Sequence, residues 1–136
     1  MTCTAQELRQ VIAQHYNGSD HNYRHSMNPR MIYTGGVREV AQKAEAYWFL
    51  DWVAFHAVPV YSKAWEKGAA GVGIITLVVK ANRTGNATLS LEDGQPPAAT
   101  LALDFTDFPE GEWKFYLCTD MDGESYISTM CLPAER

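Results

Sequence analysis

The stretch that most constrains the fold is the run of residues 46–58, Ala-Tyr-Trp-Phe-Leu-Asp-Trp-Val-Ala-Phe-His-Ala-Val. Asp51 and His56 are its only strongly polar residues. A helix that is apolar on all sides has to be buried, and this one is shorter than the roughly 20 apolar residues that a membrane span needs. We therefore predict a central buried helix. Pro59 is expected to end it, because the residue before a proline avoids helical geometry.

The region before about residue 67 is predicted to be helical. A capping box formed by Thr4 and Glu7 opens a first helix, which Asn17-Gly18 is expected to end. A second helix follows Gly36. The sequence leaves open whether the helical region 36–58 is one helix or two, with a break near Glu45.

From residue 72 to residue 132 the spacing of apolar residues becomes that of strands. We predict strands at 72–81, 88–91, 100–105 and 113–118, and a last strand or a turn of helix at 126–132, with turns near 82–85 and 92–94. Helices followed by strands are typical of an α+β protein. The prediction is a single domain over 1–136, in which N-terminal helices, one of them the buried aromatic helix, pack on an antiparallel sheet meander.

The expected core centres on Trp48. We expect Trp48, together with Trp52 or Phe55, to be mostly buried against the sheet. The side chains predicted to oppose them across the core are Leu101, Leu103 and Phe115.

The charge of the chain is concentrated in its second half. Residues 1–68 hold seven Lys and Arg against six Asp and Glu, a net charge of +1. Residues 69–136 hold four against ten, a net charge of −6, so the whole chain carries −5. Direct nucleic-acid binding is not expected, since it needs a basic surface. We expect instead an acidic edge that binds a basic host protein or nucleoprotein complex. Its predicted residues are Asp104, Asp107, Glu110, Glu112, Asp120 and Asp122.

Targeting and cofactor signals are weak throughout the chain. The N-terminus lacks a basic and then apolar signal peptide, and no apolar run has membrane length. We therefore expect a protein of the host-cell cytosol that does not act at a membrane. Cys3, Cys118 and Cys131 have no Cys-x-x-Cys spacing, so neither a disulfide framework nor a structural zinc site is expected. His21 and His25 lack a second ligand pair, and we predict no metal and no cofactor.

One set of polar residues is an alternative candidate site, a pocket lined by Tyr23, Arg24, His25, Tyr33 and Asp51. A histidine and a carboxylate can exchange protons, and an arginine can hold an anion. The favoured interpretation is structural: Asp51 is buried and paired with Arg24, His25 or a tyrosine hydroxyl, because a buried charge needs a partner. No residue is predicted to be catalytic.

Several phrases of the chain stand in the same order as in an uncharacterised family. They are Tyr23-Arg24-His25, Tyr33-Thr34-Gly35-Gly36-Val37, Ala46-Tyr47-Trp48-Phe49-Leu50-Asp51, Ala87-Thr88-Leu89, Glu92-Asp93-Gly94, Phe105-Thr106-Asp107-Phe108-Pro109 and Tyr116-Leu117. The chain resembles, over roughly residues 5–135, a bacterial domain of unknown function carried by phages, plasmids and integrative elements. Glu45 stands where the family pattern leads us to expect glycine. The resemblance implies an accessory protein of a mobile element and brings no activity with it.

These observations leave three hypotheses for the function. The first is a non-enzymatic protein-binding accessory protein of a phage or mobile element. One form of it is inhibition of a host defence complex of the CRISPR type through the acidic surface. The second is a small enzyme that uses the Tyr/Arg/His/Asp pocket. The third is a structural homodimer joined along an exposed strand edge.

Overall fold

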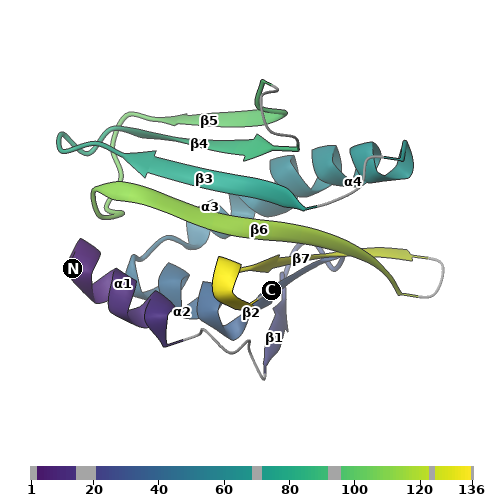
Figure 1. Cartoon of the computed structure of the whole chain (residues 1–136), viewed down its shortest axis with the longest axis horizontal. Coiled ribbons are helices and arrows are strands. Elements are labelled where there is room, and N and C mark those ends of the chain that lie inside the picture. Colours follow the sequence, from purple (N-terminus) through teal and green to yellow (C-terminus); the bar gives the residue numbers. More distant parts are fainter. Residues whose placement is uncertain (1–2, 15–20, 69–71, 92–95, 123–124, 136) are drawn as a thin grey trace.

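The computed structural model describes residues 3–14, 21–68, 72–91, 96–122 and 125–135. It confirms an α+β protein with helices packed on one seven-stranded, mostly antiparallel sheet (Figure 1). The helices are α1 (Ala5–Ala13), α2 (Gly35–Lys43), α3 (Tyr47–Trp52), the π-helical η1 (Val53–Ala57), α4 (Val58–Glu66) and the 3₁₀ turn η2 (Pro133–Glu135). The strands are β1 (Asn22–Arg24), β2 (Met31–Thr34), β3 (Gly73–Val79), β4 (Gly85–Ser90), β5 (Ala99–Leu103), β6 (Gly111–Asp122) and β7 (Ser125–Cys131).

The strand order departs from a simple meander. It is β1-β2-β7-β6-β3-β4-β5, with β2 and β7 parallel and the other pairs antiparallel. The chain leaves β5 at one edge and returns as β6 beside β3. Its connection runs past the β3–β4 turn, where the Arg83 guanidinium donates to the carbonyl oxygen of Phe108 at 2.8 Å and the Thr106 amide donates to the carbonyl oxygen of Arg83. Long-range contacts of this kind decide which strands become neighbours.

The first helix confirms the predicted capping box. The Thr4 hydroxyl accepts from the Glu7 amide, and the Glu7 carboxylate accepts from the Thr4 amide. The predicted stop at Asn17-Gly18 lies outside the described residues. Helix α1 lies below the start of β6 in Figure 1. This first part of β6 is not paired with β7, because the pairing of the two strands begins at Tyr116.

The helical region 36–58 contains a break, and the break is at Glu45. Helix α2 ends at Lys43 and α3 begins at Tyr47, and between them Glu45 has a φ of 54°. The left-handed region is unfavourable for residues with a Cβ and is easily adopted by glycine. This conformation agrees with the glycine that the family pattern led us to expect at position 45.

We predict that Glu45→Gly raises the free energy of unfolding by about 1 kcal/mol, because glycine relieves the left-handed strain. Glu45→Ala is the matched control, since alanine removes the side chain but keeps the Cβ. Urea unfolding curves measure both variants. A glycine variant no more stable than the alanine variant would contradict a strained backbone at this position.

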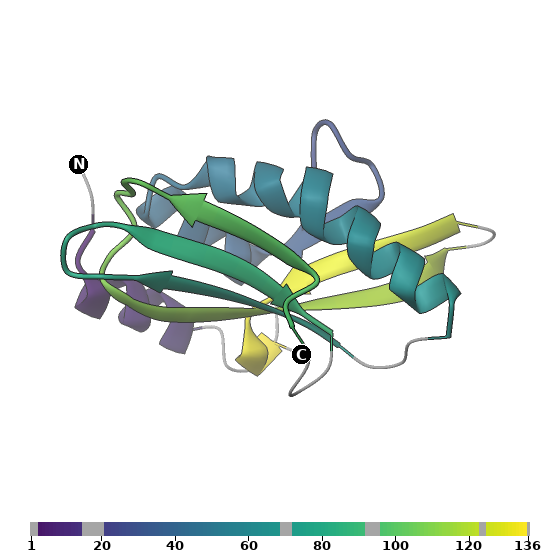
Figure 2. The same cartoon turned by 90° about the horizontal axis from the view of Figure 1, so that it is seen from above.

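The central helix is longer than predicted, because Pro59 does not end it. Helices α3, η1 and α4 form one continuous rod along one face of the sheet (Figure 2). A proline in a helix lacks the amide that would bond four residues back, and its ring clashes with that carbonyl. Here the π turn accommodates the proline. The amide of Val58 donates to the carbonyl oxygen of Val53, five residues back, and the carbonyl oxygen of Ala54 accepts from the Asn28 side chain at 2.8 Å. In that π register the donor for Ala54 would have been the missing amide of Pro59.

The aromatic core centres on Phe49 rather than on Trp48. The ring of Phe49 is buried and lies 5.3 Å from that of Phe115, 6.2 Å from that of Trp52 and 6.3 Å from that of Phe108 between ring centroids. Trp52 is buried as predicted.

The prediction that Trp48 and Trp52 are mostly buried is confirmed, since Trp52 is buried and Trp48 is partly buried against the core. Its alternative, in which Phe55 takes the place of Trp52, was wrong, because Phe55 is 46% exposed. Leu101 and Leu103 are half-buried against the core. The rod therefore turns one face to solvent, and its all-round apolar composition does not mean all-round burial.

Candidate functional site, a tyrosine cluster and an exposed helix ridge

The β1–β2 hairpin places two tyrosines side by side. Tyr23 pairs directly with Tyr33 in the antiparallel register, so both side chains point to the same face of the sheet. Their rings stack with centroids 6.0 Å apart. Burial raises the pKa of the Tyr33 hydroxyl, and the neighbouring Tyr47 adds to the shift.

An arginine from the next helix completes this tyrosine cluster. The Arg38 guanidinium lies 4.5 Å above the centre of the Tyr23 ring and donates to the Tyr23 hydroxyl at 3.1 Å. The hydrogen bond to Tyr23 is the main cause that raises the pKa of Arg38, and the Tyr47 hydroxyl adds to it. We call Tyr23, Tyr33 and Arg38 the tyrosine cluster. It joins the hairpin to α2 and reaches the start of α3.

His25 and Asp51 form the link between the hairpin and the central helix. Nε2 of the buried His25 lies 2.8 Å from Oδ1 of Asp51, while Nδ1 accepts from the backbone amides of Met27 and Asn28, each at 3.1 Å. Because Nδ1 accepts two N–H groups, the ring proton is on Nε2 and is donated to Asp51. His25 therefore has no nitrogen available to take a proton from a substrate.

Asp51 keeps the predicted partner but not the predicted burial. The contact with His25 is confirmed. The expectation of a buried carboxylate was wrong, since the Asp51 side chain is 58% exposed. The carboxylate lies on the outer side of α3, where it can accept hydrogen bonds from a second molecule.

An exposed ridge follows the outer side of the rod. Tyr47, Asp51 and Phe55 recur every four residues and are all exposed, Tyr47 to 44%. Met27, 73% exposed, is connected to Phe55 through His25, whose ring lies edge-on to that of Phe55 with centroids 5.7 Å apart and accepts from the amide of Met27. We call Tyr47, Asp51 and Phe55 the ridge.

The predicted pocket residues are brought together in part. Tyr23, His25, Tyr33 and Asp51 all join the site. Arg24 does not, since it is exposed and strand alternation points it to the sheet face opposite Tyr23. Three contributors, Arg38, Tyr47 and Phe55, were not among the predicted site residues. The spacing of four residues on either side of Asp51 could have identified the two aromatic residues, whereas Arg38 carries no local signal.

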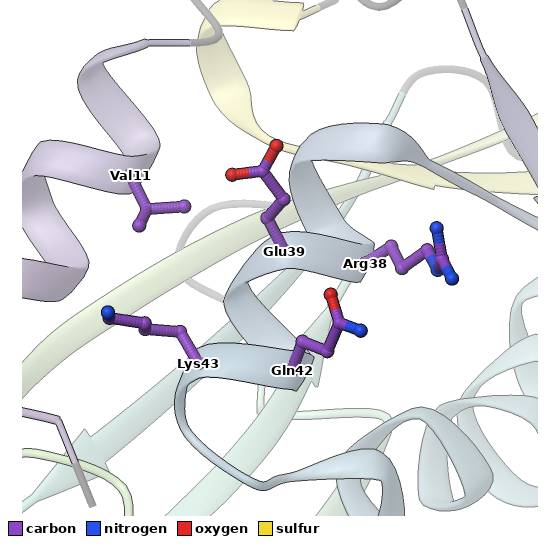
Figure 3. Close-up of a pocket in the computed structure, with 5 residues that line it drawn as sticks. All are labelled: Val11, Arg38, Glu39, Gln42 and Lys43. Atoms are coloured by element: carbon purple, nitrogen blue, oxygen red, sulfur yellow. The ribbon is translucent and has the colours of Figure 1, made fainter.

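Arg38 also borders an open groove between α1 and α2 of about 540 Å³ (Figure 3). The groove is lined by Val11, Arg38, Glu39, Gln42 and Lys43. Lys43 pairs with Glu7 of α1 at 3.6 Å. In Figure 3 the Arg38 side chain extends away from Val11 and Lys43, toward the other side of α2. The groove is open and charged, and two of its charged residues have partners already: Lys43 is paired with Glu7, and Arg38 belongs to the tyrosine cluster.

The predicted acidic edge is divided between two places. Asp104, Asp107 and Glu110 are exposed in the β5–β6 connection, beside Glu112 at the start of β6. Asp120 lies eight residues farther along β6, which corresponds to about 26 Å, and the side chain of Asp122 lies outside the described residues.

Basic residues accompany the first of these groups. Glu112 contacts Lys114 at 3.4 Å, and Arg83 donates to the backbone of Asp107 and Phe108. Among the described side chains, Asp120 therefore lies apart from the other four predicted acids.

A metal centre finds no support among the side chains that the structure describes, since no cluster of three His, Cys, Asp or Glu residues could hold an ion. In the same part of the chain, none of Cys3, Cys118 and Cys131 forms a disulfide. Among the described residues, every helix is too short or too polar to cross a membrane.

A comparison with known families identifies the chain. The model of the family of unknown function DUF6876 matches residues 6–136. The chain belongs to this family. The match runs from α1 to η2, so both the tyrosine cluster and the ridge lie within the region characteristic of DUF6876. No curated protein and no solved structure matches the chain.

Proposed function

We propose that this DUF6876 protein is a non-enzymatic binding protein whose ridge receives a basic side chain of a protein partner. The observation that supports this most is the aromatic–carboxylate–aromatic order of Tyr47, Asp51 and Phe55 on the exposed side of a rigid helix. Tyrosine and other aromatic residues, with methionine and arginine, are enriched at protein interfaces. Three of the large exposed hydrophobic residues among those described, Met27, Tyr47 and Phe55, gather here.

The chemistry of the ridge favours a cation as the group bound. An aromatic face attracts an ammonium or guanidinium group, and the exposed Asp51 carboxylate between the two rings supplies a charge-assisted hydrogen bond. Arg38 over Tyr23 is an intramolecular example of the same contact. The net charge of −6 on residues 69–136 would draw a basic partner toward the protein from a distance.

The alternative of a small enzyme has weaker support. Its acid–base pair would be His25 and Asp51, yet both ring nitrogens of His25 are used in the fold. A general base must have a lone pair within reach of the substrate proton. The pair therefore serves better as a structural link than as a catalytic one.

The biological setting that we propose is an accessory role in a phage or other mobile element. The partner would be a basic host protein or a nucleoprotein complex, with a defence complex of the CRISPR type as the specific candidate. This setting is supported by the resemblance of the sequence phrases to proteins of mobile elements.

The test is quantitative affinity capture from a lysate of the organism that carries the protein. We expect one basic protein to be recovered by the wild type and lost at least tenfold with Tyr47→Ala/Phe55→Ala and with Asp51→Asn. Phe105→Ala is the matched control, because Phe105 is an exposed aromatic residue, 66% accessible, that lies in the β5–β6 connection and not on the ridge. Equal recovery by the ridge variants and the wild type would overturn the proposal.

A second experiment distinguishes long-range electrostatic attraction of the partner from direct contact with it. Charge reversal of Asp107, Glu110 and Glu112, none of them a ridge residue, is expected to slow association with the purified partner and to leave dissociation nearly unchanged. Surface plasmon resonance at two salt concentrations measures both rates. An association rate that depends neither on these charges nor on salt would contradict a basic partner.

A further inference from the structure

The outer edge of β5 is the least protected part of the described sheet. β5 is an end strand, so every second residue turns its amide and carbonyl groups away from β4. Natural proteins usually protect such edges with charged residues, proline or a bulge. The five residues Ala-Thr-Leu-Ala-Leu carry no charge and no proline and pair with β4 in continuous register.

From this edge we infer that the protein forms a two-fold symmetric homodimer by antiparallel pairing of β5 with β5 of a second copy. Pairing centred on Leu101 keeps the helices of both copies on the same face of one continuous sheet, because facing residues of an antiparallel pair point the same way. The register places Leu103 opposite Ala99 of the second copy and Thr100 opposite Ala102. Leu103 then meets the small Ala99, Leu101 meets its own copy on the two-fold axis, and no charge meets its own copy.

Two exposed apolar residues flank β5. Phe105, 66% exposed, and Pro97 each lie two residues beyond an end of the strand, so a register extended past both ends would bring Phe105 opposite Pro97 of the second copy. An aromatic ring against a proline ring would cover apolar surface on both copies. On the helix side, the half-buried Leu101 and Leu103 would lose their remaining contact with water. The edge thus offers a second copy both hydrogen bonds and apolar contacts.

A charge-swap experiment tests the register directly. Thr100 and Ala102 are exposed on the face away from the helices, so substitutions there spare the core. In Thr100→Lys/Ala102→Lys, each of the two lysines introduced into one copy faces a lysine introduced into the other copy. In Thr100→Glu/Ala102→Lys, each introduced glutamate faces an introduced lysine. Facing pairs of like and opposite charge differ enough for the two dimers to differ about tenfold in dissociation constant.

Sedimentation equilibrium of the full chain measures these constants, and circular dichroism verifies that both variants are folded. We expect a wild-type dimer in the micromolar range, a dilysine variant weakened at least tenfold, and a Glu/Lys variant close to the wild type. A wild type that stays monomeric up to about 1 mM would overturn the inference. So would two double variants with equal constants, since the interface would then lie elsewhere.

The inference is independent of the proposed binding function. Tyr47→Ala/Phe55→Ala is expected to keep the dimer, whereas Phe105→Ala is expected to weaken it and still capture the partner. A ridge variant that lost the dimer would contradict the β5 interface without bearing on partner binding.

Discussion

Replacing Phe49 with alanine is expected to lower the free energy of unfolding by about 3–5 kcal/mol. Phe49 is almost fully buried, and its ring contacts those of Trp52, Phe108 and Phe115, from the central helix, the β5–β6 connection and β6. Its removal leaves a cavity where these three elements meet. Since domains of this size are stable by only about 5–15 kcal/mol, the variant would lose a large share of its stability.

Urea unfolding of Phe49→Ala, followed by tryptophan fluorescence, measures this loss. Trp48→Ala is the first control and should cost clearly less, because Trp48 is half-buried. Phe105→Ala is the second, and a change within about 0.5 kcal/mol is expected for this exposed site. A larger loss for Trp48→Ala than for Phe49→Ala would mean that the aromatic core has a different centre.

Replacing Asp51 with alanine is expected to cost about 1–3 kcal/mol, although its side chain is mostly exposed. The cost arises at the other end of the contact. The Nε2–H of the buried His25 would lose its acceptor, and an unsatisfied buried donor carries most of its desolvation penalty. The loop that carries Met27 and Asn28 would be held less firmly, since its amides bond to the same ring.

Asp51→Asn is the matched control, because its side-chain oxygen can still accept from His25. We expect it to cost less than half as much as Asp51→Ala in urea unfolding. The two variants also separate the roles of Asp51: if the carboxylate serves a basic partner, Asp51→Asn loses capture while keeping most of its stability. Equal stability losses for both variants would indicate that the negative charge, rather than the hydrogen bond, stabilises the fold.

Local features were predictable because their causes lie within a few residues. The capping box at Thr4 and Glu7 needs no more than one helical turn. The alternation of β5 is visible in the sequence, since strand side chains repeat every two residues, and β3 is recognisable from its β-branched residues. The α+β class follows from the change of period after residue 67.

Two properties of the central helix, which side is buried and where it ends, could not be predicted from neighbouring residues alone. Its apolar composition indicated burial, but composition alone does not say which side meets the sheet. The structure turns Phe49 inward and Phe55 outward. The Pro59 stop signal was overridden from outside the helix, because Asn28 donates to the carbonyl of Ala54 in the π turn. No sequence pattern near Pro59 reveals that the donor is Asn28, which lies in a loop 26 residues before Ala54.

The candidate site divides in the same way. Four residues of the site, Tyr23, His25, Tyr33 and Asp51, were predicted from the sequence, because few polar residues lie near the apolar helix, whereas the exposed positions of Tyr47 and Phe55 were not. Tertiary structure decided that Arg38 joins them, that Arg24 points away, and that both nitrogens of His25 are occupied. The physical reason is that side-chain types and periods are properties of a segment. Exposure and hydrogen-bond partners, by contrast, depend on which segments the folded chain brings into contact.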